Sequence, residues 1–164
     1  MLLSINQSDI SQLIEKSYQN KRKRAIKVIH PPQKEGYRMI INCIQPDSYI
    51  QPHIHKLNNG SENWIYLKGK IGLILFDTTG KIEDIKIISH NSHLMIDIPP
   101  NTYHTAISLE KDSIMYEVSN GPYDQNTYKE FAPWAPNEES ENQADYLQQL
   151  KKKMEEFYDT KKNS

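Results

Sequence analysis

The feature that most constrains the fold is a series of short, isoleucine-rich runs between Tyr37 and Ser119, each ended by a turn signal. Runs of this length and composition, bounded by Gly, Pro, Asn or Asp, predict β-strands. Because no helical pattern separates them, they predict a sandwich or barrel rather than a βαβ sheet. The expected strands are Met39–Ile44, Ser48–His55, Trp64–Leu67, Ile71–Phe76, Ile82–Ile88, Leu94–Ile98, His104–Leu109 and Ser113–Val118.

Helical periodicity flanks this β region. A short helix is expected from Ser8 to about Asn20, with Ser8 as the N-cap and Asp9 in the first turn. A longer amphipathic helix is expected from about Glu141 to about Lys161. The expected organisation is a single domain with an N-terminal helix and basic lead-in (1–30), a β barrel with an extended proline-rich tail (31–138) and a C-terminal helix (139–164).

The run Ile71–Phe76 is apolar at every position but Gly72, so both faces of this strand need a cover. One face suits the barrel interior. The other requires a helix, the tail or a second subunit. The C-terminal helix therefore either covers its own barrel or adds to a subunit interface.

Charge and composition exclude several classes of function. With 20 Lys+Arg against 21 Asp+Glu, the chain has no bulk field that attracts nucleic acid or an anionic membrane. The basic run Lys21–Arg24 reads as the end of the first helix, or as a binding site for a phosphate or acidic ligand. Cys43 is the single cysteine, which excludes an intrachain disulfide framework. Without a membrane-length apolar stretch or a secretory leader, a soluble cytoplasmic protein is expected.

The histidines carry the chemistry. His53 and His55 are separated by one residue in an expected strand, so both imidazoles point to one face. Glu62 begins the next strand after an Asn58–Gly60 turn, and His104 follows the turn Pro99–Tyr103. Three imidazoles and one carboxylate suit a divalent transition metal, with positions left for water or substrate. Zn, Fe and Mn are the leading candidates for that metal.

These residues resemble the two cupin motifs. Pro52-His53-Ile-His55, Glu62 and Gly69 match the first motif, in which Asp47 stands in place of the leading glycine and the His55–Glu62 gap is longer than usual. Pro99-Pro-Asn101-Thr-Tyr-His104 matches the second, with Asn101 in place of glycine; asparagine tolerates the left-handed backbone that this position needs. The resemblance implies an all-β double-stranded β-helix (jelly-roll barrel) with a metal inside one end. It also implies a homodimer paired through its sheets.

A narrower resemblance, to WbuC-type cupin metalloproteins, covers roughly residues 22 to 138. It rests on the basic stretch ending at His30, on Tyr49–His55, on Tyr116–Tyr123 and on Trp134–Pro136. That family occurs in bacterial gene clusters for O-antigen and other surface polysaccharides. The resemblance implies metal-dependent isomerisation or epimerisation of a sugar or sugar nucleotide, with a non-catalytic ligand-binding cupin and an iron-dependent dioxygenase as alternatives.

An isomerase needs an acid–base group near the metal. Glu117, Tyr103 and Tyr49 are candidates by residue type, and Arg38 and His30 are candidates for contacting the substrate. Whether Glu117 faces the barrel interior or the solvent is left open by the pattern. If it faces inward, it is a buried carboxylate that needs a partner or has a raised pKa.

Overall fold

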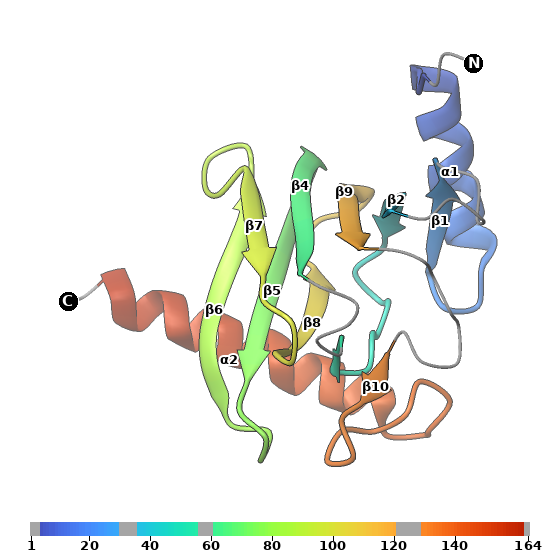
Figure 1. Cartoon of the computed structure of the whole chain (residues 1–164). Coiled ribbons are helices and arrows are strands. Elements are labelled where there is room, and N and C mark those ends of the chain that lie inside the picture. Colours follow the sequence, from blue (N-terminus) through green and yellow to red (C-terminus); the bar gives the residue numbers. More distant parts are fainter. Residues whose placement is uncertain (1–3, 30–35, 56–60, 121–128, 163–164) are drawn as a thin grey trace.

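The computed structural model describes residues 4–29, 36–55, 61–120 and 129–162. Two antiparallel five-stranded sheets face each other, one in the order β1-β2-β9-β4-β7 and the other in the order β10-β3-β8-β5-β6 (Figure 1). The chain forms a jelly-roll double-stranded β-helix, as expected. The elements are α1 Gln7–Gln19, β1 Arg24–Val28, β2 Tyr37–Ile44, β3 His53–Ile54, β4 Glu62–Lys68, β5 Lys70–Phe76, β6 Ile82–Ser89, β7 Met95–Ile98, β8 Tyr103–Ser108, β9 Ser113–Asn120, β10 Glu130–Phe131 and α2 Gln143–Lys162.

The N-terminal helix begins earlier than expected. Asn6, and not Ser8, is the N-cap of α1: its side chain accepts a hydrogen bond from the Asp9 amide, and the Asp9 carboxylate accepts one from the Asn6 amide. This reciprocal pair is a capping box, which satisfies two backbone donors at once. Asp9 lies in the first turn as expected.

Strand β1 was not expected. It pairs antiparallel with β2, from Arg24 opposite Ile44 to Val28 opposite Ile40. Arg24 therefore opens a strand rather than closing α1, which ends at Gln19. β1 lies at the edge of its sheet, where charged residues are tolerated, so its sequence lacks a clear apolar alternation.

Strand β3 is much shorter than the expected run Ser48–His55. Pro52 has no amide hydrogen for a ladder, and side chains take the place of a partner strand before it. Thr105 Oγ1 donates to the Ile50 carbonyl at 2.6 Å, and Arg24 Nη1 donates to the Tyr49 carbonyl at 2.8 Å. Only His53 and Ile54 join the sheet, between β8 and β10.

Helix α2 covers the outer face of the second sheet (Figure 1). Alternate residues of β5 divide between the two faces: Ile71 and Leu73 pack between the sheets, and Ile74 and Phe76 pack beneath α2. Gly72 permits the closest approach, because a Cβ at this position would lie 2.0 Å from the Met154 methyl carbon. The double cover expected for this strand is thus confirmed, and the chain itself supplies it. No helix of the described residues is long and apolar enough to span a membrane.

Candidate metal centre

Three histidines meet where strands β3 and β8 pair at one end of the second sheet. His53 of β3 lies directly opposite His104 of β8, and the Asn101 amide donates to the His55 carbonyl at 2.7 Å, which fixes the turn before β8 against β3. Asn101 has φ = +59°, the left-handed conformation expected for it. The ring centroids lie 4.6 Å apart for His53 and His104, and 5.1 Å apart for His53 and His55.

Glu62 completes the cluster from the other sheet. It is the first residue of β4, it is buried, and its Oε2 lies 3.0 Å from Nε2 of both His55 and His104. The four side chains each offer one ligand atom, and these atoms lie within 4.8 Å of one another. The expected Asn58–Gly60 turn lies outside the described residues, yet the longer gap does not prevent Glu62 from reaching the histidines.

Backbone carbonyls fix the orientation of two imidazoles. His53 Nδ1 lies 2.9 Å from the Gln51 carbonyl oxygen, and His104 Nδ1 lies 2.9 Å from that of Thr102. Because a carbonyl oxygen only accepts, each Nδ1 carries the hydrogen and each Nε2 of the neutral ring keeps its lone pair. This is the usual outer contact of a metal-binding histidine. Burial also lowers the pKa of His53 well below its ordinary value, which favours the neutral form.

The donor atoms of this cluster, three imidazole nitrogens and a carboxylate oxygen, suit a bound cation. Burial alone would raise the pKa of Glu62, but the neighbouring rings of His104 and His55 bring it well below the ordinary value, so a carboxylate stands among the imidazoles. With the neutral tautomer above, Nε2 of His104 and Oε2 of Glu62 would set two lone pairs 3.0 Å apart. A proton or a metal ion removes that repulsion. Nitrogen and oxygen donors of this kind suit a transition metal.

A cavity of about 440 Å³ opens beside the cluster, with His53 and Glu62 in its wall. Glu117 of β9 faces into it, which decides between the two orientations left open by the sequence. Its Oε1 accepts from Arg38 Nη1 at 2.5 Å, and its Oε2 accepts from Asn42 Nδ2 at 2.8 Å. Burial, and next the charge of Glu62, raise the pKa of Glu117 to about 8, against the opposing charge of Arg38.

Other expected site residues lie elsewhere. Tyr49 is buried in the cluster beneath α2, and its hydroxyl donates to the Pro136 carbonyl at 2.7 Å; burial raises the pKa of this tyrosine. Tyr103 precedes His104 on β8, so it points to the opposite face and packs against Trp134, with ring centroids 5.7 Å apart. Neither tyrosine lines the cavity. His30 and the segment Gly121–Tyr123 lie outside the described residues.

The cavity also has polar residues that the sequence did not single out as site residues. Asn42 was detectable in principle, because Arg38, Ile40, Asn42 and Ile44 alternate along one face of β2 and all line the cavity. Lys129 and Glu138 come from the proline-rich tail and gave no local signal. Arg22 and Arg24 also line the cavity; they belong to the basic run Lys21–Arg24, for which the sequence left open a helix end or a site for a phosphate or acidic ligand.

Comparisons with solved structures agree on the fold. Protein SO0799 from Shewanella oneidensis aligns over 78% of this chain and 85% of its own, with a TM-score of 0.59 and 9% identity. Oxalate decarboxylase from Bacillus subtilis aligns over 66% of this chain with a TM-score of 0.51 and 16% identity, and an oxalate oxidase in complex with the substrate analogue glycolate aligns over 70% with a TM-score of 0.53 and 16% identity. The matches cover 27% and 57% of these two enzyme chains. The likeness establishes the cupin fold.

Sequence comparison gives a family without an activity. The profile of a family described as a domain of unknown function (DUF6016) matches residues 5–88, from α1 to the end of β6. That stretch includes three of the four clustered side chains, His53, His55 and Glu62. No curated protein sequence matches the chain.

Proposed function

The chain belongs to the DUF6016 family, and we propose that it is a metal-dependent cupin enzyme that isomerises or epimerises a sugar or sugar nucleotide. The observation that carries the proposal is the convergence of His53, His55, Glu62 and His104 in the wall of a cavity that also holds Glu117. A cavity of about 440 Å³ is within the usual range for small-molecule sites, about 300–1,000 Å³.

The four clustered side chains would hold one divalent transition metal, as Zn, Fe or Mn. Bound there, such a metal polarises a substrate oxygen or lowers the pKa of a bound water. Three neutral imidazoles and one carboxylate leave a net charge of +1 on a divalent site. That charge favours an anionic or chelating ligand, for example an enediolate, a carboxylate or vicinal hydroxyls.

Glu117 is the proton-transfer group in this proposal. It lies inside the cavity, and Arg38 and Asn42 each hold one of its oxygens. This support fixes the direction of the carboxylate, as general acid–base catalysis requires. Arg38 would also orient an anionic substrate once the ligand enters, because its guanidinium lies in the same cavity wall.

A non-catalytic, metal-dependent binding protein is the second candidate, and one observation favours it. Both oxygens of Glu117 are already engaged by Arg38 and Asn42, so the carboxylate must exchange a partner before it takes a substrate proton. In that case the same cavity would bind and release the ligand unchanged. An iron-dependent dioxygenase is the third candidate, and it depends on the identity of the metal.

The role in O-antigen or other surface-polysaccharide assembly, in the cytoplasm, rests on the WbuC-like sequence motifs. We also propose a homodimer. Because α2 covers the outer face of one sheet and α1 packs on β2 and β9 of the other, the surface left for a partner is the outer face of β4 and β7, where Leu67 and Met95 are exposed.

Elemental analysis tests the proposal. The untagged protein, purified without chelator, is expected to carry about one equivalent of a transition metal, and the variant His53→Ala/His55→Ala is expected to carry none. Iron would favour oxygen chemistry, whereas zinc or manganese would favour isomerisation. The absence of metal from the native protein, even after reconstitution, would refute the proposal. In the metal-loaded protein, Glu117→Gln is then expected to abolish turnover of sugar substrates while metal content stays unchanged.

A further inference from the structure

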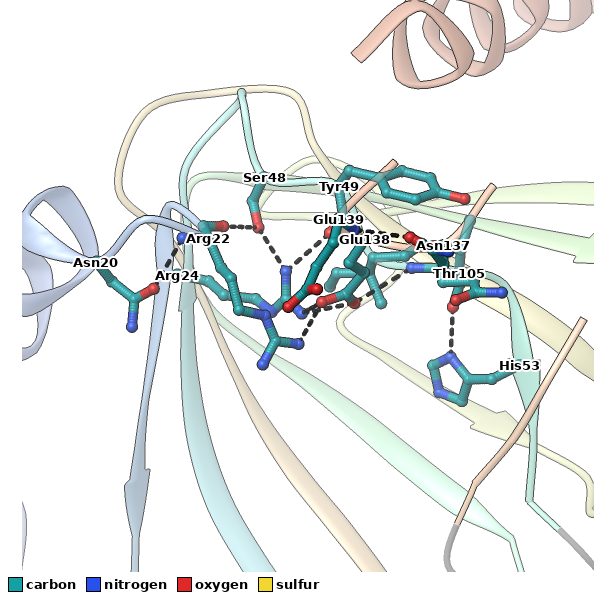
Figure 2. Close-up of polar contacts among 12 residues, drawn as sticks. Asn20, Arg22, Arg24, Ser48, Tyr49, His53, Thr105, Asn137, Glu138 and Glu139 are labelled. Carbon is teal, nitrogen blue, oxygen red and sulfur yellow. Dashed lines mark hydrogen bonds and ion pairs between the residues drawn. The ribbon is translucent and has the colours of Figure 1, made fainter. Parts of the chain in front are cut away.

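An ionic cluster at one side of the metal cavity holds more positive than negative charge. The Glu138 carboxylate lies between two guanidinium groups (Figure 2). Arg24 Nη2 lies 2.7 Å from Oε1 and 2.6 Å from Oε2, and Arg22 Nη2 lies 2.5 Å from Oε2. One carboxylate therefore faces two permanent positive charges, and balances only one of them.

The two arginines differ in how firmly they are held. The guanidinium of Arg24 also donates to the Tyr49 carbonyl at 2.8 Å and to Ser48 Oγ at 3.3 Å, and its side chain is 13% exposed. The Arg22 side chain is 59% exposed. The cluster thus combines one fixed guanidinium with one that can move toward a ligand.

This cluster adjoins the proposed metal ligands. Arg22, Arg24 and Glu138 line the same cavity as His53 and Glu62. A single residue, Gln51, joins the two groups: its amide donates to Glu138 Oε1 at 3.4 Å, and its carbonyl accepts from His53 Nδ1 at 2.9 Å. A ligand of moderate length can therefore reach both groups at once.

We propose that Arg22 and Arg24 form a phosphate subsite of the cavity, in which Glu138 takes the place of the phosphate while the ligand is absent. A phosphate monoester carries about −1.5 to −2 charges at neutral pH, which balances both guanidiniums as one carboxylate does not. Arginine forks also match phosphate oxygens in geometry. The inference rests on the proposed function only in assigning the other end of the ligand to the metal cluster. It narrows the ligand to a sugar that carries a phosphate.

Calorimetric titration of the full-length protein with inorganic phosphate tests the subsite. Arg22→Ala is expected to weaken phosphate binding about tenfold, and Glu138→Gln, which removes the competing charge, is expected to strengthen it about tenfold. Arg22→Ala leaves the Arg24–Glu138 pair in place, so the fold is retained. Lys152→Ala is the matched control, since it removes one positive charge from the exposed face of α2, and it is expected to change nothing. Parallel titrations with glucose 1-phosphate and UDP-glucose distinguish a monoester from the diphosphate of a nucleotide sugar.

Three outcomes would overturn the subsite. If Arg22→Ala and Lys152→Ala bind phosphate equally well, or if Glu138→Gln lowers the unfolding temperature without raising phosphate affinity, Glu138 only fastens the tail to β1. If phosphate binding is lost in His53→Ala/His55→Ala and unaffected by Arg22→Ala, the phosphate binds at the metal. A protein that carries no metal but binds phosphate in an Arg22-dependent manner would instead refute the proposed function and support the subsite.

Discussion

Replacing Met154 by alanine tests whether α2 rests on its own barrel. Met154 is 2% exposed and packs against the outer face of β5, where Gly72 leaves room for its methyl group. Met→Ala changes in cores cost about 2–5 kcal/mol, and the cost is greater where the surroundings cannot collapse into the cavity. One wall of this cavity is the backbone of a central strand, which is rigid, so we expect about 3–5 kcal/mol.

Urea denaturation followed by circular dichroism measures that loss. Thermal unfolding followed by the same signal gives a second measure, in which the midpoint is expected to fall by about 6–20 °C, at about 2–4 °C per kcal/mol for a chain of this size. Lys152→Ala is the control on the same helix, because the Lys152 side chain is 77% exposed, and it is expected to cost less than about 0.5 kcal/mol.

A loss at Met154 no larger than at Lys152 would refute the reasoning, since α2 would then not be packed on β5 in solution. The difference in midpoint between Met154→Ala and the unmodified protein is also expected not to change with protein concentration, because Met154 packs within one chain. A Met154→Ala effect that grows with dilution would mean that α2 packs on a second subunit.

Three further predictions follow from single features. Asn101→Val is expected to destabilise the protein by about 1–2 kcal/mol in urea denaturation, because Asn101 has φ = +59°, whereas Asn101→Gly should be nearly neutral; equal costs would contradict this backbone argument. Cys43 is fully buried, and burial raises the pKa of its thiol, so Ellman's reagent at pH 8 is expected to react only after the protein unfolds; rapid labelling of the native protein would contradict that burial. A metal supplied at about 100 times its dissociation constant is expected to stabilise the protein by about 2.7 kcal/mol, seen as a rise of about 5–11 °C in the unfolding temperature, and this rise should vanish in His53→Ala/His55→Ala.

The strands and the histidine cluster were predictable because each has a local signal. The Ile71–Phe76 run shows its two covered faces in its composition, and His53 and His55 show a shared face in their spacing. Glu62 was predictable from the motif despite the longer gap, because β4 is fixed in the opposite sheet by its own apolar residues. In each case, the signal that predicts the structure comes from residues close together in the sequence.

Features that depend on register were harder to predict. The partners of Glu117 are Arg38 and Asn42, which flank its cross-strand neighbour Ile40 on β2, and only the β2–β9 register places them there. The period-two rule already separates Tyr103 from His104, since adjacent strand residues point to opposite faces. Residue type had made Tyr103 a candidate, but side-chain direction is the stronger constraint.

The contact between the basic run and the proline-rich tail could not be predicted. Arg24 and Glu138 are 114 residues apart, and neither has a local pattern that indicates the other. The edge strand β1 carries two positive charges, Arg24 and Lys27, on opposite faces, which obscure its apolar pattern. Such a contact becomes visible only when the fold brings the two segments together.

The two-residue length of β3 has a consequence for how the protein matures. β3 is held on one side by β8 and on the other by β10, and the Ala132 amide donates to the Pro52 carbonyl at 2.8 Å. The tail residues that brace His53 are therefore translated after every barrel strand from β1 to β9. During synthesis the nascent chain has all four clustered side chains before it has β10, the strand that braces His53. Loading of the proposed metal is thus expected to follow release of the tail from the ribosome, rather than to guide folding of the barrel.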